Sequence, residues 1–541
     1  MNYTISGLRI SLDEPEDILA VKAAGLLGIA VEMISSWRIL RRSLDARRRR
    51  APFYIYNLEI SLRGNPPVRS RFEGGITIER QDEENGLPGV LASYPAVTGS
   101  GPEKTIKERP VVVGAGPAGL FAALVLASYG LPVLLLERGK ALEERVRDVE
   151  AFWQEGRLDP ESNVQFGEGG AGAFSDGKLT SRANHPYSRW VKEILVELGA
   201  PESIRIEAKP HIGTDRLRMV LVNFRKRLLS LGCELRFNAR VTDFLLSQGR
   251  PAALVVNGEE EIAARNVILA MGQSARDTYE KLQTIGVRLE AKPFAMGLRI
   301  EHPQGMIDRL QYGRWAGHDG LPPAEYVLKT RITHLDRYVY SFCMCPGGSI
   351  IGAASEPGQL LINGMSDYKR DNFRGNSALV VNVRTGDFPG DDPLRGILFR
   401  DEWERRAFRL GGGDYRAPAQ GLADFLEEGP GILAGPVSFR PGATPADMRE
   451  VLPEFVSKAL REGIRDFDRL MPGFICPEAT LVGVETRTSS PVRICRDQEG
   501  QAVGMSGLYP CGEGAGYAGG IISSALDGIN AALSFCKSVR P

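Results

Sequence analysis

The stretch from Pro110 to Glu137 constrains the fold more than any other part of this 541-residue chain. It begins with VVVGAG, continues through PAGLFAALVLASYG and ends in LPVLLLERG. The first run is typical of a buried strand, and the second has Pro117 just inside a helix and Gly130 just past its end. The third run indicates a second buried strand, which finishes at the acidic Glu137. We therefore predict a strand, helix and strand of a parallel sheet.

Three glycines at the first turn of this unit have the spacing G-x-G-x-x-G. Gly114 permits the tight turn, Gly116 lets the backbone approach a pyrophosphate, and Gly119 lets the helix lie close to its strand. Glu137 ends the next strand, where a carboxylate can accept both hydroxyls of an adenosine ribose and repels a 2'-phosphate. The pattern is a dinucleotide-binding fingerprint.

The same glycine spacing recurs twice, at Gly167, Gly169 and Gly172 and at Gly514, Gly516 and Gly519. The first recurrence lies in FGEGGAGAFSDGKL, which runs into turn residues without a helical stripe. The second precedes a helical pattern, but no further strand and acid follow before Pro541. We therefore predict one complete dinucleotide site and no separate NAD(P)H domain.

Composition narrows the classes of function. Lys plus Arg equals Asp plus Glu at 67 each, so no global field favours nucleic acid or an anionic membrane. Seven cysteines fit reduced thiols, and five histidines without metal-ligand spacing indicate no metal site. The start has no secretory pattern, and glycines and prolines interrupt the apolar run 111–136. We expect a cytoplasmic protein without a membrane span.

Residues 1–63 are predicted to form a small N-terminal β-α-β-β unit. DILAVKAAGLLG has a helical pattern that stops near Gly28, and apolar residues alternate from Tyr54 to Leu62 as on a half-buried strand. RRSLDARRRR lies between them; a solvated charge run is favoured, and an anion or RNA contact is the alternative. Residues 64–104 collect Gly, Pro and mixed charges, which indicates a linker or arm.

Motifs along nearly the whole chain resemble the two-dinucleotide-fold flavoproteins related to glutathione reductase, and within them a group of largely uncharacterised FAD-dependent dehydrogenases. They are RRSLDAR, VVVGAGPAGLFAA, FGEGGAGAFSDGKL, FCMCPGG, AASEPGQLLINGMS, GVETRTSSPVRI and GLYPCGEGAGYAGGIISSALDGI. The resemblance implies FAD and an α/β fold. It implies a discontinuous Rossmann-type FAD-binding domain, residues 105–290 and 480–541, around an inserted α+β substrate or cap domain, residues 291–479.

The resemblance also implies where the cofactor lies. Gly512 and Glu513 would lie beside the ribityl and diphosphate groups, and Gly519 and Gly520 would bring the start of the last helix to the pyrimidine edge of the flavin. Helix amides stabilise the negative charge that reduction puts on that edge. The expected cofactor-binding residues are Gly114, Gly116, Pro117, Ala118, Gly119, Glu137, Arg138, Gly167, Gly170, Gly172, Gly272, Gly512, Glu513, Gly519, Gly520 and Ile521.

In related flavoproteins the segment after the first βαβ unit curls under the flavin, where glycines allow close backbone approach. FGEGGAGAFSDGKL is therefore predicted to be a flavin and active-site loop, with Ser175, Asp176 and Lys178 as catalytic candidates. The alternative is a structural turn with a corner at Asp176-Gly177. Gln273 stands where the resemblance leads us to expect a histidine, so we assign it no proton transfer.

Cys343 and Cys345 in SFCMCPGG invite a redox interpretation, because two thiols near a flavin can pass electrons. Residues i and i+2 on a regular strand lie about 6.6 Å apart at Cα, near the upper limit for a disulfide. Disulfide reductases of the glutathione type also carry their pair on the helix after the first FAD segment. A structural role is therefore predicted for both cysteines.

Together these features predict an FAD-dependent oxidoreductase, a dehydrogenase that transfers hydride or electrons between a small-molecule substrate and FAD. The sequence does not identify the electron donor or acceptor, and NAD(P)H is one candidate. One alternative is a flavin monooxygenase that uses NAD(P)H without a domain for it. The other is a non-catalytic flavin-binding redox sensor whose N-terminal unit binds RNA or protein. We expect no membrane partner and favour no nucleic-acid partner.

Overall fold

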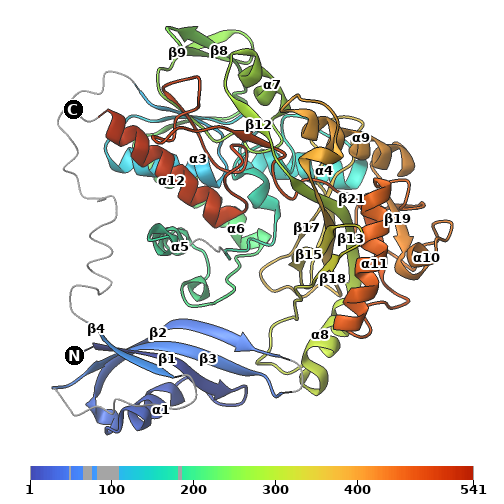
Figure 1. The fold of residues 1–541 in the computed structure, drawn as a ribbon. Coiled ribbons are helices and arrows are strands. Elements are labelled where there is room, and N and C mark those ends of the chain that lie inside the picture. The colour runs from blue at the N-terminus through green and yellow to red at the C-terminus, as the bar shows by residue number, and fades with distance from the viewer. Residues whose placement is uncertain (1, 48–49, 65–75, 82–108, 181–184, 540–541) are drawn as a thin grey trace.

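The computed structural model describes residues 2–47, 50–64, 76–81, 109–180 and 185–539. The chain forms three parts (Figure 1): a small N-terminal sheet at one end, a five-stranded parallel sheet with its helices, and a seven-stranded sheet. The parallel sheet takes strands from both sides of the seven-stranded part in the sequence.

The N-terminal unit has the expected β-α-β-β order. Its elements are β1 (Asn2–Ser11), α1 (Ile18–Leu27), β2 (Ile34–Asp45) and β3 (Phe53–Leu62). The helix ends at Gly28, whose φ of +73° is the left-handed conformation that glycine adopts without strain. A further strand, β4 (Thr77–Gln81), pairs with β1 and gives the order β2-β3-β1-β4. The sheet therefore includes residues from the range expected to be a linker.

Arg42, in the arginine-rich stretch, joins the N-terminal unit to the rest of the molecule. Its backbone donates to Ile206 O (2.7 Å) and accepts from Ala208 N (2.8 Å). Its guanidinium forms ion pairs with Glu16 and Glu207. This arginine is structural, whereas two members of the expected charge run, residues 48 and 49, lie outside the described residues.

The predicted Rossmann-type sheet is confirmed. Its order is β23-β11-β5-β6-β7 and every pair is parallel. The strands are β5 (Val111–Val113), β6 (Leu134–Leu136), β7 (Glu234–Arg236), β11 (Val267–Leu269) and β23 (Leu508–Pro510). The first two and β11 are apolar and fully buried, as expected for parallel strands covered on both faces.

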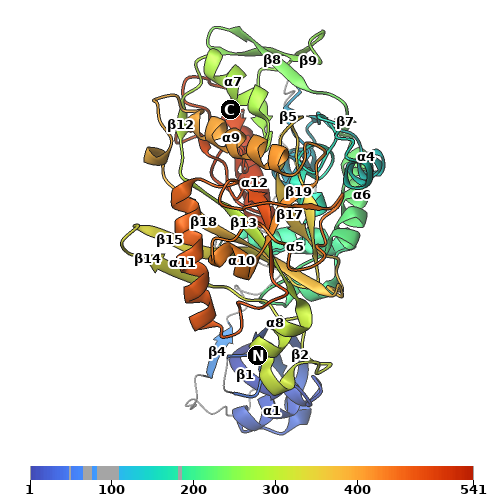
Figure 2. The same ribbon diagram turned by 90° about the vertical axis from the view of Figure 1, so that its right-hand side faces the viewer.

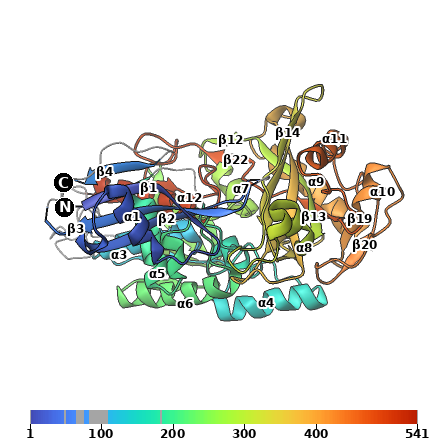
Figure 3. The same cartoon turned by 90° about the horizontal axis from the view of Figure 1, so that it is seen from below.

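Helices α3 (Pro117–Ser128) and α12 (Ile521–Ser538) lie side by side against this sheet (Figure 1). They approach so closely that a Cβ at Gly528 would stand 2.0 Å from Ala118 O. Figure 3 shows α4 and α6 along the same edge of the molecule. The remaining elements of this part are α4 (Leu142–Glu155), α5 (Tyr187–Glu197), α6 (Thr214–Ser230), β8 (Val241–Ser247), β9 (Arg250–Val256), β10 (Glu260–Ala263) and α7 (Arg276–Thr284).

The inserted part is built on a seven-stranded sheet of order β14-β15-β18-β13-β21-β19-β20. Its strands are β13 (Phe294–Pro303), β14 (Lys329–Ile332), β15 (Arg337–Cys345), β18 (Arg374–Val383), β19 (Ala417–Gly421), β20 (Ala443–Pro445) and β21 (Thr480–Glu485). Since β21 pairs with β13 and β19, residues 480–485, which we expected in the second FAD segment, lie in the seven-stranded sheet.

Helix α11 (Glu454–Leu470) lies against this sheet and buries one apolar face on it (Figure 2). The other elements are β12 (Leu289–Ala291), α8 (Gln304–Tyr312), β16 (Ser349–Gly352), β17 (Ile362–Met365), α9 (Arg395–Leu410), α10 (Leu422–Leu426) and β22 (Val492–Ile494). Strands β12 and β22 pair where the chain leaves and re-enters the FAD-binding part. No helix in the described part of the chain has both the length and the apolar character to span a bilayer.

Candidate functional site

A cavity of about 390 Å³ lies at the carboxyl ends of the parallel strands. Its wall includes the turn after β5, the end of β6, the residues after β11 and those after β23. The loop 165–178 and strands β15, β17 and β21 close it from the other sides. In open α/β sheets, ligands bind outside the carboxyl ends of the strands, so this cavity is the candidate site.

Nearly all the expected cofactor-binding residues line this cavity. They are Gly114, Gly116, Pro117, Ala118, Glu137, Arg138, Gly170, Gly172, Gly272, Gly512, Glu513, Gly519, Gly520 and Ile521. Gly119 and Gly167 do not line it. A Cβ at Gly119 would stand 1.8 Å from Gly114 O, and one at Gly167 would stand 2.4 Å from Arg145 Cδ. These two glycines therefore allow close internal contact.

The glycines that face the cavity form a cradle that a dinucleotide fits. A Cβ built at Gly272, Gly519 or Gly520 meets no atom within 4 Å, and one at Gly116 meets only Gly170 Cα at 3.9 Å. At each of these glycines, the position that a side chain would occupy is therefore open space in the cavity. Gly114 differs, because its Cβ would lie 2.3 Å from Ala270 O and its φ is +102°.

Two helices present their N-terminal ends to the cavity. α3 begins at Pro117 and α12 begins at Ile521, and both residues line the wall. Unpaired amides and the helix dipole make such ends favourable for anions. Gly520 N donates to Glu513 Oε1 at 2.7 Å, and burial raises the pKa of Glu513. The arrangement suits a diphosphate and an anionic reduced flavin.

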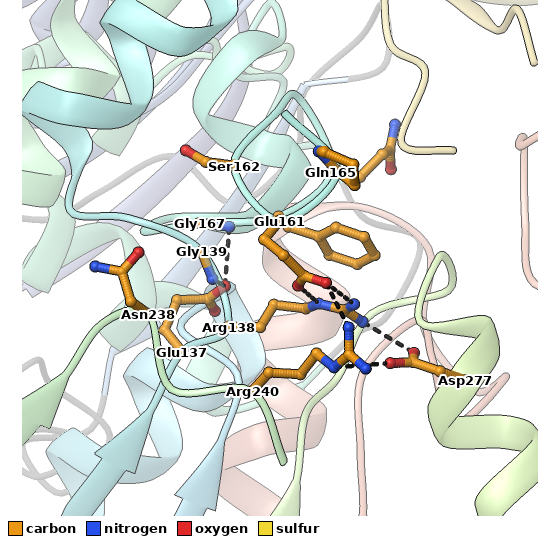
Figure 4. Close-up of polar contacts among 12 residues, drawn as sticks. Glu137, Arg138, Gly139, Glu161, Ser162, Gln165, Gly167, Asn238, Arg240 and Asp277 are labelled. Carbon is orange, nitrogen blue, oxygen red and sulfur yellow. Dashed lines mark hydrogen bonds and ion pairs between the residues drawn. The ribbon is translucent and has the colours of Figure 1, made fainter. Parts of the chain in front are cut away.

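Glu137 is already well bonded at the end of β6 (Figure 4). Its Oε1 accepts from Gly139 N (3.0 Å) and Gly167 N (2.9 Å), and its Oε2 accepts from Ala115 N (2.7 Å). A carboxylate offers about four lone-pair positions, so about one is left for a ribose hydroxyl rather than the two expected from the sequence. Glu137 also fastens the β5 turn to the loop at Gly167.

We expect Glu137→Gln to lose bound flavin and to lower the free energy of unfolding by about 1–3 kcal/mol, because an amide group would face backbone donors that the carboxylate now satisfies. Flavin released by heating and thermal unfolding of the same samples measure the two effects. The exposed Glu259→Gln serves as the matched control. Normal flavin content in Glu137→Gln would contradict this role.

Beside Glu137, two arginines and two carboxylates form one network (Figure 4). Arg138 donates to Glu161 Oε2 (2.8 Å) and Asp277 Oδ1 (2.9 Å), and Arg240 donates to Glu161 Oε1 (2.7 Å). The Arg138 guanidinium also lies 4.0 Å from the centre of the Phe166 ring. Because both arginines are paired with carboxylates, neither offers a free charge to a 2'-phosphate.

Ser175, Asp176 and Lys178 line the cavity as well. Ser175 Oγ donates to Gly172 O (2.8 Å) and accepts from Gly177 N (3.1 Å), as in a structural turn. Asp176, 1% exposed, accepts from Arg370 Nε (3.1 Å) and Nη2 (2.5 Å). Although burial opposes it, the charges of Lys178 and Arg370 lower the pKa of Asp176. Its carboxylate is therefore held ionised.

Lys178 reaches across to the inserted part. Its Nζ donates to Met344 O and lies 3.4 Å from Asp176 Oδ2. Although burial opposes it, Cys345 and Cys343 raise the pKa of Lys178, and Asp176 does so too. The ammonium group is therefore a fixed positive charge at this end of the cavity.

Several cavity residues were not predicted from the sequence, namely Gln165, Arg240, Cys343, Asn363, Glu485, Arg487 and Thr488. Glu485 and Arg487 belong to GVETRTSSPVRI. This motif contributed to the family resemblance, but neither residue was predicted to lie in the site. Gln273 accepts from Arg400 Nη1 (3.1 Å) and donates to Arg487 O (3.0 Å). These bonds give Gln273 a positioning role.

Comparison with known domain families matches three segments of the chain. Residues 108–287 match the pyridine nucleotide-disulphide oxidoreductase domain. Residues 293–488 match the C-terminal domain-like family of FAD-dependent proteins. Residues 2–61 match a domain of unknown function. The first two matches cover most of the cavity wall, except the residues from Cys511 to Ser524.

An uncharacterised protein of Clostridium beijerinckii is 44% identical over 535 residues, 98% of either chain. Among solved structures, a geranylgeranyl bacteriochlorophyll reductase-like protein of Thermoplasma acidophilum covers 80% of this chain and 78% of its own, with 12% identity and a TM-score of 0.36. NikD, an amino acid oxidase, covers 79% and 93%, with 14% identity and the same score. At TM-scores this low, neither similarity supports an assignment of function.

Proposed function

Since this chain belongs to the family of FAD-dependent proteins that join a pyridine nucleotide-disulphide oxidoreductase domain to an FAD-dependent C-terminal domain, we propose that its cavity holds FAD against the glycine cradle. The bound FAD would exchange electrons with a small molecule at the Lys178 end of the cavity. The protein is an FAD-dependent oxidoreductase. When bound, FAD supplies hydride or electron transfer. The observation that carries the proposal is that both helix N-termini and the glycine cradle line one cavity.

Residues at one end of the cavity would hold the adenosine and diphosphate. The turn at Gly114 and Gly116 and the start of α3 would hold the phosphates, with Glu137 beside the ribose. Gly512, Gly519 and the start of α12 would bind the flavin end. We also place the chain among the two-dinucleotide-fold flavoproteins related to glutathione reductase; the ordered motifs from VVVGAG to GLYPCGEG support this finer assignment.

The opposite end of the cavity would receive the substrate. Lys178 supplies a fixed positive charge there, and Asp176 holds both Lys178 and Arg370 in place. This charge favours a substrate that is anionic or that becomes so when it gives up a proton. Ser175 holds the loop that carries them.

The test is to purify the full chain, identify its flavin and mix it anaerobically with NADH and with NADPH, followed by reoxidation with oxygen. We expect a yellow protein with one FAD per chain. Rapid bleaching with either nucleotide places a nicotinamide in the cycle. A protein that binds no FAD even when reconstituted with it would overturn the proposal, and a flavin that no reductant turns over would favour the sensor.

We expect Asp176→Asn to keep its FAD and to slow flavin reduction by about tenfold or more, because Arg370 and Lys178 lose the carboxylate that positions them. Stopped-flow reduction with the donor found above measures the rate, and heat-released flavin measures the content. Asp371→Asn, an exposed change on the same segment, is the control. An unchanged rate would leave Asp176 with a structural role alone.

A further inference from the structure

Strand β15 is not regular where it carries its two cysteines. Its pairing with β18 shifts register between Phe342 and Cys345. Cys343 lies in this bulge with a φ of +47°, a left-handed conformation that non-glycine residues seldom adopt. The Cα spacing of a regular strand therefore does not apply to this pair, so that spacing gives no argument against a disulfide between the two cysteines.

The bulge turns Cys343 to the cavity and leaves Cys345 behind it. Cys343 is partly exposed and lines the cavity wall, whereas Cys345 is 0% exposed. The two residues remain in contact, because Cys345 Sγ donates to Cys343 O at 3.4 Å. One thiol can meet a ligand of the cavity while the other stays within its reach.

Two cations face the pair. Lys178 Nζ donates to Met344 O, between the cysteines, and Arg299 Nη1 donates to Cys343 O at 3.4 Å. The hydrogen bond from Cys345 lowers the pKa of Cys343 most; burial opposes it, and Lys178 and Arg299 lower the pKa further. Hydrogen bonds and nearby cations are what make a thiol reactive.

Three acidic groups lie nearby, and the charge of Asp176 opposes the cations by raising the pKa of Cys343. Asp176 pairs with Lys178 and Arg370, and Glu485 pairs with Arg299. Glu513, which also lines the cavity, accepts from Gly520 N and Gln273 Nε2. Lys178 and Arg299 therefore have carboxylate partners and also donate to the backbone of the Cys343–Met344 segment.

Cys511 shows that a place in the cavity wall alone does not produce this chemistry. It also lines the cavity and is 0% exposed. Burial and the charge of Asp527 raise its pKa. The bulge, the second thiol and the two cations distinguish Cys343.

We propose that Cys343 and Cys345 are a redox-active pair that exchanges two electrons with FAD bound in the same cavity. In the oxidising direction the Cys343 thiolate and the Cys345 thiol form an S–S bond. Two electrons and the proton of Cys345 pass to oxidised FAD, which becomes the reduced anion. The reverse step reopens the bond. This inference rests on the proposed function and adds a second electron store to it.

The test is an anaerobic titration of the air-oxidised, FAD-loaded full chain with dithionite. We expect wild type to take up about twice the electrons per FAD that Cys343→Ser or Cys345→Ser takes up, since a disulfide and a flavin each accept two. Mass spectrometry of the peptide 338–369 should find it two hydrogens lighter in the oxidised protein. Equal uptake in all three proteins, with both thiols free, would overturn the pair and leave the FAD assignment intact.

A second measurement needs no turnover and no flavin. In the reduced apoprotein at pH 6, iodoacetamide should modify Cys343 about tenfold faster than the partly exposed Cys495, whose pKa burial raises. Lys178→Met should reduce this difference, because the charge of Lys178 also lowers the pKa of Cys343. Equal rates for the two cysteines would contradict an activated thiol. If the chain binds no FAD but Cys343 is still modified faster than Cys495, the result would contradict the proposed function and leave the activated thiol supported.

Discussion

Gly116→Val is expected to yield a folded protein without flavin. A Cβ at Gly116 meets nothing closer than Gly170 Cα at 3.9 Å, and its φ of −76° suits any residue. The larger side chain therefore fits the protein but fills the space beside the start of α3, where a pyrophosphate would lie. We expect FAD affinity to fall at least about a hundredfold, or about 2.7 kcal/mol.

Isothermal titration of the apoprotein with FAD measures this loss, and circular dichroism checks the fold. Gly386→Val is the matched control, because Gly386 is exposed and a Cβ there meets no atom within 4 Å. Gly116→Ala should lose less affinity, since a methyl group fills less of the space. Retained affinity in Gly116→Val would place the pyrophosphate elsewhere.

Arg299→Met should destabilise the inserted domain by about 3–5 kcal/mol, because it leaves a buried carboxylate without its partner. Arg299 is 0% exposed and donates to Glu485 Oε2 at 2.7 Å. It also donates to Asn376 Oδ1 (2.5 Å) and Asn363 Oδ1 (3.2 Å). The pair joins β13 to β21, and Glu485 lines the cavity.

Thermal unfolding with excess FAD measures this cost as a lower midpoint. The double variant Arg299→Met, Glu485→Leu should recover part of the loss, because no unpaired charge then stays buried. Arg331→Met, at an exposed ion pair, should change the midpoint little. If Arg299→Met were as stable as wild type, the Glu485 carboxylate would have to take up a proton without lowering the free energy of unfolding.

The cofactor end of the site could be predicted from the sequence because its determinants are local. Gly114, Gly116 and Gly119 lie within one turn and the start of one helix, and Gly119 meets Gly114, five residues away. Glu137 was placed correctly at the end of β6. Its three amide bonds were not predicted, because Gly167 N approaches it only after the later loop folds back.

The substrate end could not be predicted in the same way. Arg370 lies 194 residues from Asp176, and Glu485 lies 186 residues from Arg299. No spacing rule links such partners. The bulge at Cys343 was missed because its register is set by pairing with β18, while the letters SFCMC read as an ordinary strand.

The place of β23 in the parallel sheet also determines when the FAD site can form during translation. β23 extends the sheet beside β11, and α12 covers α3, yet both are translated long after β5. Until they leave the ribosome, β11 has an unpaired edge and the cavity lacks the wall at Gly512 and Gly520. The nascent chain must therefore be nearly complete before it can capture a flavin, and a product stopped before β23 would emerge without the wall that receives one.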